Sequence, residues 1–248
     1  MDGPMRDSDL AEDVPGEQPV PRHLVASQDL VMLSNPRSAA AEMFRRLKTS
    51  IVGPQVIVVT SAAPREGKSL VASNLALAFA ADRDASVVLV DGDLRRPSIG
   101  AWLDPAPSLG LSEILSNQAE LDGCLLDLHD SHLKILPAGR QAVDPVELLN
   151  SDRATSVMAE LRVRFRHVIV DTAPILGFTD ANVLAGLADG VFMVARSGVT
   201  PKAAYLQALS MITSSRILGT VLNDATYALA DRDQYYGDYY SEYYDERK

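Results

Sequence analysis

The chain has little cysteine and tryptophan, with one of each, and it has no long apolar run. Because a single cysteine cannot form an intrachain disulfide, Cys124 is interpreted as a small buried hydrophobic residue. No stretch approaches the roughly 18 consecutive apolar residues that a spanning helix needs, and no basic start with an apolar run marks a secretory signal. The sequence therefore predicts a cytoplasmic, reduced protein that reaches the inner face of the membrane only through a partner.

The chain also lacks a basic region, and its acidity is concentrated at the two ends. Of the net charge of -10, residues 1–30 contribute -5 and residues 231–248 contribute -3. A nearly neutral centre offers no broad basic face, so no nucleic acid partner is expected. With 248 residues and 47% hydrophobic content, the chain can bury one large α/β core.

What the chain does contain is a phosphate-binding pattern in residues 55–69, QVIVVTSAAPREGKS. The β-branched run Val56–Val59 suits a strand buried on both faces, and a helix is predicted over Leu70–Ala81. A strand that passes through a short turn into a helix directs free N–H groups and the positive end of the helix dipole at one point. That point suits a triphosphate.

The last three residues of this segment match the end of the G-x-x-x-x-G-K-[ST] motif, although Ala62 replaces its first glycine. Gly67 lets the backbone approach the phosphates, Lys68 supplies a charge for the β and γ oxygens, and the Ser69 hydroxyl is suited to Mg²⁺. The alternative is an ordinary strand, loop and helix with a surface lysine. The predicted nucleotide contacts from this loop are Pro64, Arg65, Glu66, Gly67, Lys68, Ser69 and Leu70.

A second strand, within SVVLVDGDLRRP, ends in two acids. If the strand continues through Gly92, Asp91 and Asp93 point to the same side, and their repulsion favours a bound divalent metal. Arg95 and Arg96 either neutralise phosphate or pair with these acids, and we include Arg95 among the nucleotide contacts. The alternative is a plain strand-end turn rich in Asp and Gly.

A third strand, HVIVDTAP, has the form of a Walker B strand and brings Asp171 to the same sheet edge. The alternation of strands and helices predicts an α/β fold with a doubly wound, mainly parallel sheet flanked by helices. With the phosphate-binding pattern, we expect a P-loop NTPase of the MinD/ParA-like class. The remaining predicted strands are 133–136, 191–195 and 217–222, and the remaining predicted helices are 145–163 and 200–215.

A helix is predicted from Ser38 through AAAEMFRRLKTSI. Spacings of three and four place Met43, Phe44, Leu47 and Ile51 on one face. A neighbouring stripe has two interpretations, a solvated face in which Glu42 pairs with Arg45 or Arg46, and a contact between subunits. The stripe consists of Glu42, Arg45 and Lys48.

The two ends differ in composition from the centre. Residues 1–30 are rich in Pro, Asp and Glu and are predicted to be a disordered acidic tail. Residues 225–248 are predicted to be a flexible tail, and six of the eight tyrosines form three pairs there at a four-residue period. An aromatic sticky tail and a segment that packs on a partner are the alternatives. The tyrosines are Tyr235, Tyr236, Tyr239, Tyr240, Tyr243 and Tyr244.

These motifs together resemble the bacterial tyrosine kinases of capsule and exopolysaccharide synthesis, of the Wzc and CapB type. The resemblance covers about residues 38–224 plus the tail, and places a kinase domain at residues 31–224. It rests on AEMFRRLKTSI, TSAAPREGKS, VVLVDGDLRRP, GLSEIL, LPAG followed by PVELL, VIVDTAP and the tyrosine cluster. It implies ATP-dependent tyrosine autophosphorylation with Mg²⁺, ring-like homo-oligomers, a transmembrane polysaccharide co-polymerase as activator, and a cognate tyrosine phosphatase.

On this basis we assign roles to the residues above. Ser69, Asp91 and Asp171 are the expected metal ligands, and Asp91 or Asp93 accepts the proton of the attacking tyrosine. The six tail tyrosines are the expected phosphoacceptors, used between subunits. Glu42, Arg45 and Lys48 are the expected oligomer contacts. The predicted catalytic residues are Lys68, Asp91, Asp93 and Asp171.

The sequence departs from the family pattern at two places and leaves two other functions open. Arg65 stands where the family usually has glycine, and Lys48 replaces the last arginine of its E-x-x-R-x-x-R motif. A positioning ATPase of the ParA or MinD type would have the same fold, but those proteins have a further loop lysine where this chain has Ala63. A catalytically weak regulator, whose tail docks on export proteins, is the other alternative.

Overall fold

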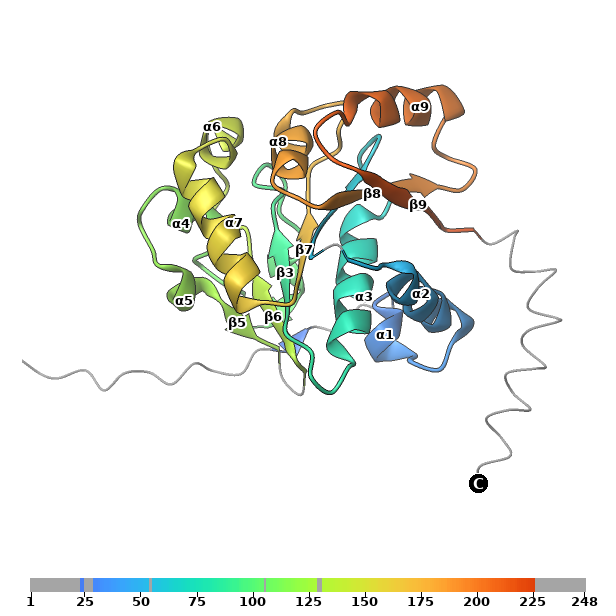
Figure 1. The fold of residues 1–248 in the computed structure, drawn as a ribbon, viewed down its shortest axis with the longest axis horizontal. Helices are drawn as coiled ribbons and strands as arrows, with labels where there is room; N and C mark the ends of the chain where they lie inside the picture. The colour runs from blue at the N-terminus through green and yellow to red at the C-terminus, as the bar shows by residue number, and fades with distance from the viewer. Residues whose placement is uncertain (1–22, 25–28, 54, 105, 129–130, 226–248) are drawn as a thin grey trace, which may run out of the picture.

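The computed structural model describes residues 23–24, 29–53, 55–104, 106–128 and 131–225, which form a central sheet with helices on both sides (Figure 1). The sheet has seven strands in the order β5-β6-β3-β7-β2-β8-β9, and only β5 runs antiparallel to its neighbour. This confirms the predicted α/β class. The strands are β2 (Val56–Ser61), β3 (Val87–Asp91), β5 (Leu126–Asp127), β6 (Leu133–Leu136), β7 (His167–Asp171), β8 (Gly190–Arg196) and β9 (Ile217–Asn223).

Two helical layers cover the sheet, each with its own apolar core. Successive side chains of β2 pack into opposite cores. Val56 and Val58 belong to one core, and Ile57 and Val59 belong to the other. One layer holds α1 (Val31–Ser34), α2 (Ala39–Ser50) and α3 (Lys68–Ala80). The other holds α4 (Leu111–Leu115), α5 (Leu121–Cys124), α6 (Pro145–Leu149), α7 (Asp152–Arg164), α8 (Asp180–Gly186) and α9 (Lys202–Met211).

Helix α3 is buried along nearly its whole length, from Val71 to Ala80. A helix that is apolar all round belongs in a core rather than on a surface. It packs against β2, β3 and β7, which fixes its N-terminus above the carboxyl ends of these strands. Cys124 is also buried, as predicted.

Two helix predictions need correction. The predicted helix 145–163 is two helices, because Ser151 caps a new one by accepting a hydrogen bond from the Ala154 amide at 3.1 Å. In α2, Phe44, Leu47 and Ile51 pack on the core, but Met43 is 42% exposed and Ala41 takes the buried position. The helix therefore presents a narrower apolar face than the predicted one.

The structure describes four residues of the predicted N-terminal tail, residues 23, 24, 29 and 30. His23–Leu24 form β1 (His23–Leu24), which pairs antiparallel with β4 (Leu103–Asp104), and Leu30 is fully buried before α1. Burial of a leucine stabilises the fold by about 2 kcal/mol, which holds this segment on the domain. Residues 1–22 and 25–28 of the predicted N-terminal tail, and all six tail tyrosines, lie outside the described residues. No helix within the described ranges is long and apolar enough to cross a membrane.

Candidate active site

The phosphate loop joins β2 to α3 and depends on glycine at its last position. Gly67 caps α3 with a φ of 93°, a left-handed conformation that favours glycine. A Cβ at this position would lie 2.0 Å from the side-chain nitrogen of Asn223. The first amides of α3 have no partner within the helix, as in any helix, and such amides are suited to binding a phosphate.

In the phosphate loop Arg65 is exposed to solvent, whereas the next residue, Glu66, is buried. Arg65 is exposed and has a φ of 64°, which explains why glycine suits this position. Glu66 is 2% exposed, and its carboxylate accepts hydrogen bonds from the Ala63 amide at 2.9 Å and from the Thr200 hydroxyl. The Glu66 side chain therefore points into the protein, where its hydrogen bonds stabilise the loop.

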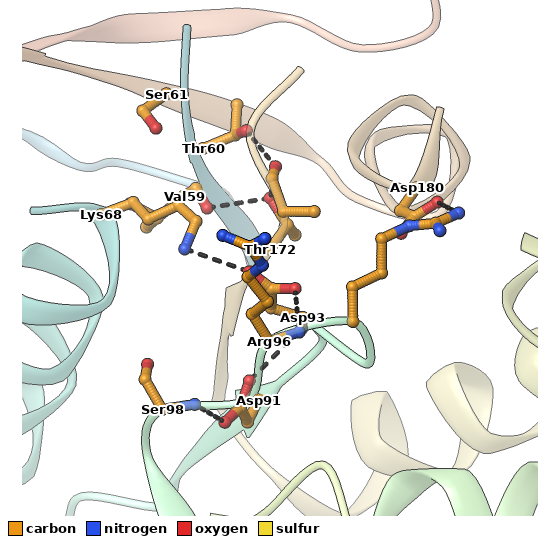
Figure 2. Close-up of polar contacts among 12 residues, drawn as sticks. Val59, Thr60, Ser61, Lys68, Asp91, Asp93, Arg96, Ser98, Thr172 and Asp180 are labelled. Carbon is orange, nitrogen blue, oxygen red and sulfur yellow. Dashed lines mark hydrogen bonds and ion pairs between the residues drawn. The ribbon is translucent and has the colours of Figure 1, made fainter. Parts of the chain in front are cut away.

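Lys68 and Asp93 form a buried ion pair at the centre of the site, drawn in Figure 2. The Lys68 Nζ lies 3.2 Å from the Asp93 Oδ2, and the Asp93 Oδ1 accepts a hydrogen bond from the Arg96 amide at 3.0 Å. Asp93 is only 3% exposed, so this carboxylate is largely shielded from water. The two predicted catalytic groups are thus in direct contact.

Asp91 points elsewhere, which corrects the prediction that it lies on the same side as Asp93. The strand ends at Asp91, and the Asp93 amide turns back to donate to the Asp91 Oδ1 at 3.3 Å. The Asp91 Oδ2 accepts hydrogen bonds from the amides of Ser98 and Ile99 at 3.1 and 3.0 Å. Asp91 therefore holds the loop after β3 in its folded form.

Asp171 sits beside Asp91 on the neighbouring strand and is fully buried. Neither of its carboxylate oxygens has a hydrogen-bond partner of ordinary geometry among the described residues. Burial raises the pKa of Asp171 to about 6, although Lys68 and Ser69 oppose the rise. Burial and the Asp171 charge likewise raise the pKa of Asp91 to about 7.

The charges of this site favour an added cation. Burial lowers the pKa of Lys68, but the attraction of Asp171, Asp93 and Asp91 outweighs it and the net pKa is raised. One ammonium thus faces three buried carboxyl groups. Mg²⁺ commonly binds through one or two carboxylates, water and substrate phosphates. The orphaned oxygens of Asp171, next to Ser69 in the first turn of α3, fit that ion. Within the described ranges, no cluster of three or more His, Cys, Asp or Glu side chains could hold a metal without such help.

Arg95, a predicted nucleotide contact, is bound to another part of the protein. Its guanidinium donates to the buried carboxylate of Asp180 at 2.7 and 3.1 Å and lies 4.4 Å from the centre of the Phe178 ring. This contact joins the loop after β3 to the start of α8. Its predicted contact with phosphate remains a prediction.

Sequence reasoning missed Thr200, Asn223 and Asp180 as residues that shape the site. Asn223 donates from its side chain to the Glu66 carbonyl at 3.0 Å, and Thr200 bonds to the Glu66 carboxylate. A signal was present for Asn223, because it ends a strand at the sheet edge where α/β proteins hold ligands. The sequence around Thr200 gave little indication of such a role, because Thr200 follows an ordinary turn.

The α2 stripe makes its ion pairs within the chain. Glu42 pairs with Arg45 at 3.3 Å and with Arg46 at 3.8 Å. Lys48 donates to Asp82 at 2.5 Å, which joins α2 to the end of α3. These pairs match the interpretation as a solvated face, and the subunit contact remains a prediction.

Comparison with known proteins gives several curated relatives. No protein-family model matches. Tyrosine-protein kinase YwqD of Bacillus subtilis (strain 168) is 31% identical over 218 residues, 85% of this chain and 92% of that protein. Tyrosine-protein kinase wzc of Salmonella typhimurium is 31% identical over 88% of this chain, and the succinoglycan biosynthesis transport protein ExoP of Rhizobium meliloti is 34% identical over 78%. The chain spans only 31% and 26% of these two longer relatives.

Solved structures show the same relationship. The chimerical protein CapA2B2 is 29% identical with a TM-score of 0.74, over 82% of this chain and 93% of that one. The kinase domain of the Escherichia coli tyrosine kinase ETK is 28% identical with a TM-score of 0.74, over 78% of this chain and 79% of that one. The cell division ATPase MinD of Pyrococcus furiosus has a TM-score of 0.56 at 24% identity, over 68% of this chain and 71% of that one, which is a likeness of fold alone.

Proposed function

Since this chain belongs to the bacterial tyrosine-protein kinases, we propose that it transfers the γ-phosphoryl group of ATP to the tyrosines of its own C-terminal segment, between subunits. The observation that carries this proposal is the Lys68–Asp93 pair at 3.2 Å beside the fully buried carboxylate of Asp171. A cation suited to phosphate, a buried carboxylate suited to a metal and a second carboxylate, paired with that cation, thus lie together. Phosphoryl transfer needs little beyond such positioning and charge stabilisation.

Each residue has a distinct part in this transfer. The amides at the start of α3 and the Lys68 ammonium hold the β and γ phosphates. Ser69 and Asp171 hold Mg²⁺, which neutralises phosphate charge when it is bound. Asp91 accepts hydrogen bonds from three backbone amides, whereas Asp93 accepts one and pairs with Lys68 through its other oxygen. Because a bound phosphate would attract Lys68, Asp93 is better suited than Asp91 as the base. A phenol of pKa about 10 is a poor nucleophile until a base accepts its proton, and Asp93 supplies that base.

The cellular setting follows from the relatives' names. One relative is a succinoglycan biosynthesis transport protein, and others are named tyrosine-protein kinases. We therefore place the kinase in the regulation of capsular or exopolysaccharide synthesis and export. It would work in the cytoplasm, at the inner face of the membrane, with a transmembrane co-polymerase as activator and a phosphatase to reverse the reaction. A ring of subunits would bring one chain's tail to the next chain's site.

The test is incubation with Mg²⁺ and γ-labelled ATP, followed by phosphotyrosine detection, with and without candidate activator segments. Lys68→Met and Asp93→Asn should lower autophosphorylation by orders of magnitude with the fold intact. Lys134→Met is the matched control, because Lys134 makes an exposed ion pair with Asp127. Unchanged autophosphorylation in either site variant would refute the assignment.

Transfer between subunits has its own test. A full-length Lys68→Met chain is mixed with an active chain that ends before Gln234. The inactive chain supplies acceptors and the truncated chain supplies catalysis, so phosphotyrosine on the inactive chain shows transfer between molecules. If only intact wild type becomes phosphorylated, transfer takes place within one chain. ATP hydrolysis without phosphotyrosine would instead favour a positioning ATPase.

A further inference from the structure

A hollow of about 410 Å³ lies next to the site and has no part in the chemistry described above. It lies between α4, α6 and the loop of residues 139–144, and we refer to it as the α4–α6 hollow. Its volume falls in the range of pockets that bind small molecules or side chains. Arg140, Gln141, Val143, Asp144, Glu147 and Leu148 are among the residues that line it.

Two hydrogen bonds attach this hollow to the loop that carries Asp93. The Gln141 side chain donates to the Arg95 carbonyl at 2.9 Å, and the Ala142 amide donates to the Leu94 carbonyl at 3.3 Å. Arg95 follows Asp93 by two residues, or about 8 Å of chain. The rim of the hollow therefore lies within roughly 15 Å of the proposed catalytic base.

This upper limit is compatible with the spacing of the acceptors in the sequence. The tyrosine pairs recur every four residues, and an extended chain advances about 3.3 Å per residue. Two successive pairs are then about 13 Å apart. We propose that the α4–α6 hollow is a docking subsite that holds one tyrosine pair of a second copy of this chain while the next pair reacts at Asp93. This inference rests on the proposed function and adds how the substrate is recognised.

The lining of the hollow suits an unmodified tyrosine pair with an acid before it. Arg140 is exposed and makes no ion pair with any described residue, while Asp238 and Glu242 directly precede two of the three pairs. An acid before the docked pair can therefore bind Arg140. Val143 has a fully exposed side chain, and Leu148 is partly buried, so both offer apolar contact to a ring.

The acids of the hollow discriminate between unmodified and phosphorylated tyrosine. Asp144 and Glu147 are exposed carboxylates in the lining, to which a phenol O–H can donate. Glu113 contributes little, since its buried carboxylate already accepts from the amides of Gly110 and Arg140. A phosphate adds about -1.5 to -2 charges. Since the lining sets the three carboxylates of Glu113, Asp144 and Glu147 against the single guanidinium of Arg140, the net effect on a phosphate is repulsion. A pair that has reacted is therefore rejected from the hollow.

Acceptor peptides provide the test. The enzyme is the full-length chain with its six tail tyrosines changed to alanine, so that its own tail does not compete. The two-pair peptide spans residues 237–244, and the one-pair peptide carries alanine at positions 239 and 240. Because docking lowers the KM of the two-pair peptide, we expect the KM of the one-pair peptide to be about tenfold higher than that of the two-pair peptide. We refer to this quotient as the KM ratio.

Two variants should abolish the lower KM of the two-pair peptide, and two matched control variants should retain it. Arg140→Glu and Val143→Ser should reduce the KM ratio to about one. Arg166→Glu and Val163→Ser change exposed residues of the same type just before β7 and on α7, neither of which lines the hollow, and should leave the ratio at about tenfold. A two-pair peptide phosphorylated at positions 239 and 240 should behave like the one-pair peptide.

Three results would overturn the proposal. These are equal KM values for both peptides with the unaltered hollow, a KM ratio that survives Arg140→Glu and Val143→Ser, and full docking of the phosphorylated pair. If neither peptide is phosphorylated, the kinase proposal itself fails. The docking proposal is then decided by fluorescence anisotropy, in which the same tenfold ratio should appear in Kd and disappear in Arg140→Glu.

Discussion

The side-chain amide of Asn223 donates to the Glu66 carbonyl at 3.0 Å and occupies the space that a side chain at Gly67 would need. The end of β9 is therefore a part of the phosphate loop, although 157 residues separate Asn223 from Glu66. A second contact links the loop to the end of β8. The Thr200 hydroxyl donates to the Glu66 carboxylate and accepts a hydrogen bond from the Arg196 amide at 2.7 Å. The loop shape thus depends on the far edge of the sheet.

Gly67→Ala tests this relationship. We expect loss of nucleotide binding and a free energy of unfolding lower by at least about 1–2 kcal/mol, because alanine is strained at a φ of 93° and its Cβ would displace Asn223. Gly123→Ala is the control, since a Cβ there meets nothing within 4 Å. Urea unfolding and binding of a fluorescent nucleotide measure both effects. Wild-type affinity in Gly67→Ala would show that the loop tolerates the displacement.

Arg65 should be replaceable with a gain in stability. It adopts a φ of 64°, which costs an ordinary residue roughly 1–2 kcal/mol and which asparagine tolerates better. We expect Arg65→Asn to raise the free energy of unfolding by about 0.5–1 kcal/mol and Arg65→Ala, which also removes the charge, to give no such gain. Nucleotide titration of the same two variants tests the predicted phosphate contact, which both would lose. Equal stability of the two variants would argue against strain at this position.

The raised pKa values of Asp91 and Asp171 predict a pH dependence of stability. In the native state their pKa values are about 7 and about 6, against an ordinary value near 3.8. Between about pH 4 and pH 7 the native state therefore holds protons that the unfolded state has released, and the free energy of unfolding falls as pH rises. Asp171→Asn should accordingly be more stable than wild type at pH 7.5, on the order of 1–3 kcal/mol, with little difference at pH 4.

Urea titrations of wild type and Asp171→Asn at the two pH values measure this effect. Affinity for Mg²⁺ and nucleotide should show the opposite trend in wild type, because the metal requires the ionised carboxylate and binding weakens as pH falls below about 6. Asp127→Asn is the control, since Asp127 is exposed in its ion pair with Lys134. A stability difference that is the same at pH 4 and pH 7.5 would exclude the proposed titration of Asp171.

The α2 stripe can be tested through the mass of the protein. Arg45→Glu should shift an oligomer toward monomer in light scattering if the stripe forms a subunit contact. Arg46→Glu is the matched control, because it pairs with the same Glu42 at the longer distance of 3.8 Å. Loss of the intrachain pair alone is worth only a few tenths of a kcal/mol, so neither variant should unfold. Unchanged mass and activity in Arg45→Glu would leave the stripe as a solvated face.

Local patterns in the sequence determined the sheet and the position of the phosphate loop. The β-branched runs of β2, β3 and β7 are typical of strands buried on both faces of a parallel sheet, and Gly67-Lys68-Ser69 follows β2 after a short loop. The acids at the ends of β3 and β7 must then meet, because parallel strands end at one edge. Asp91 and Asp171 are in register for this reason.

Tertiary structure alone decided what each side chain does at that edge. The partners of Glu66, Arg95 and Asp91 are Thr200, Asp180 and the amides of Ser98 and Ile99, and the first two lie 134 and 85 residues away. No local pattern encodes such pairs, because they form only after burial removes the alternative of hydrogen bonding to water. Burial likewise places the Asp171 carboxylate beside Lys68 and Ser69, which the strand pattern HVIVD by itself does not reveal.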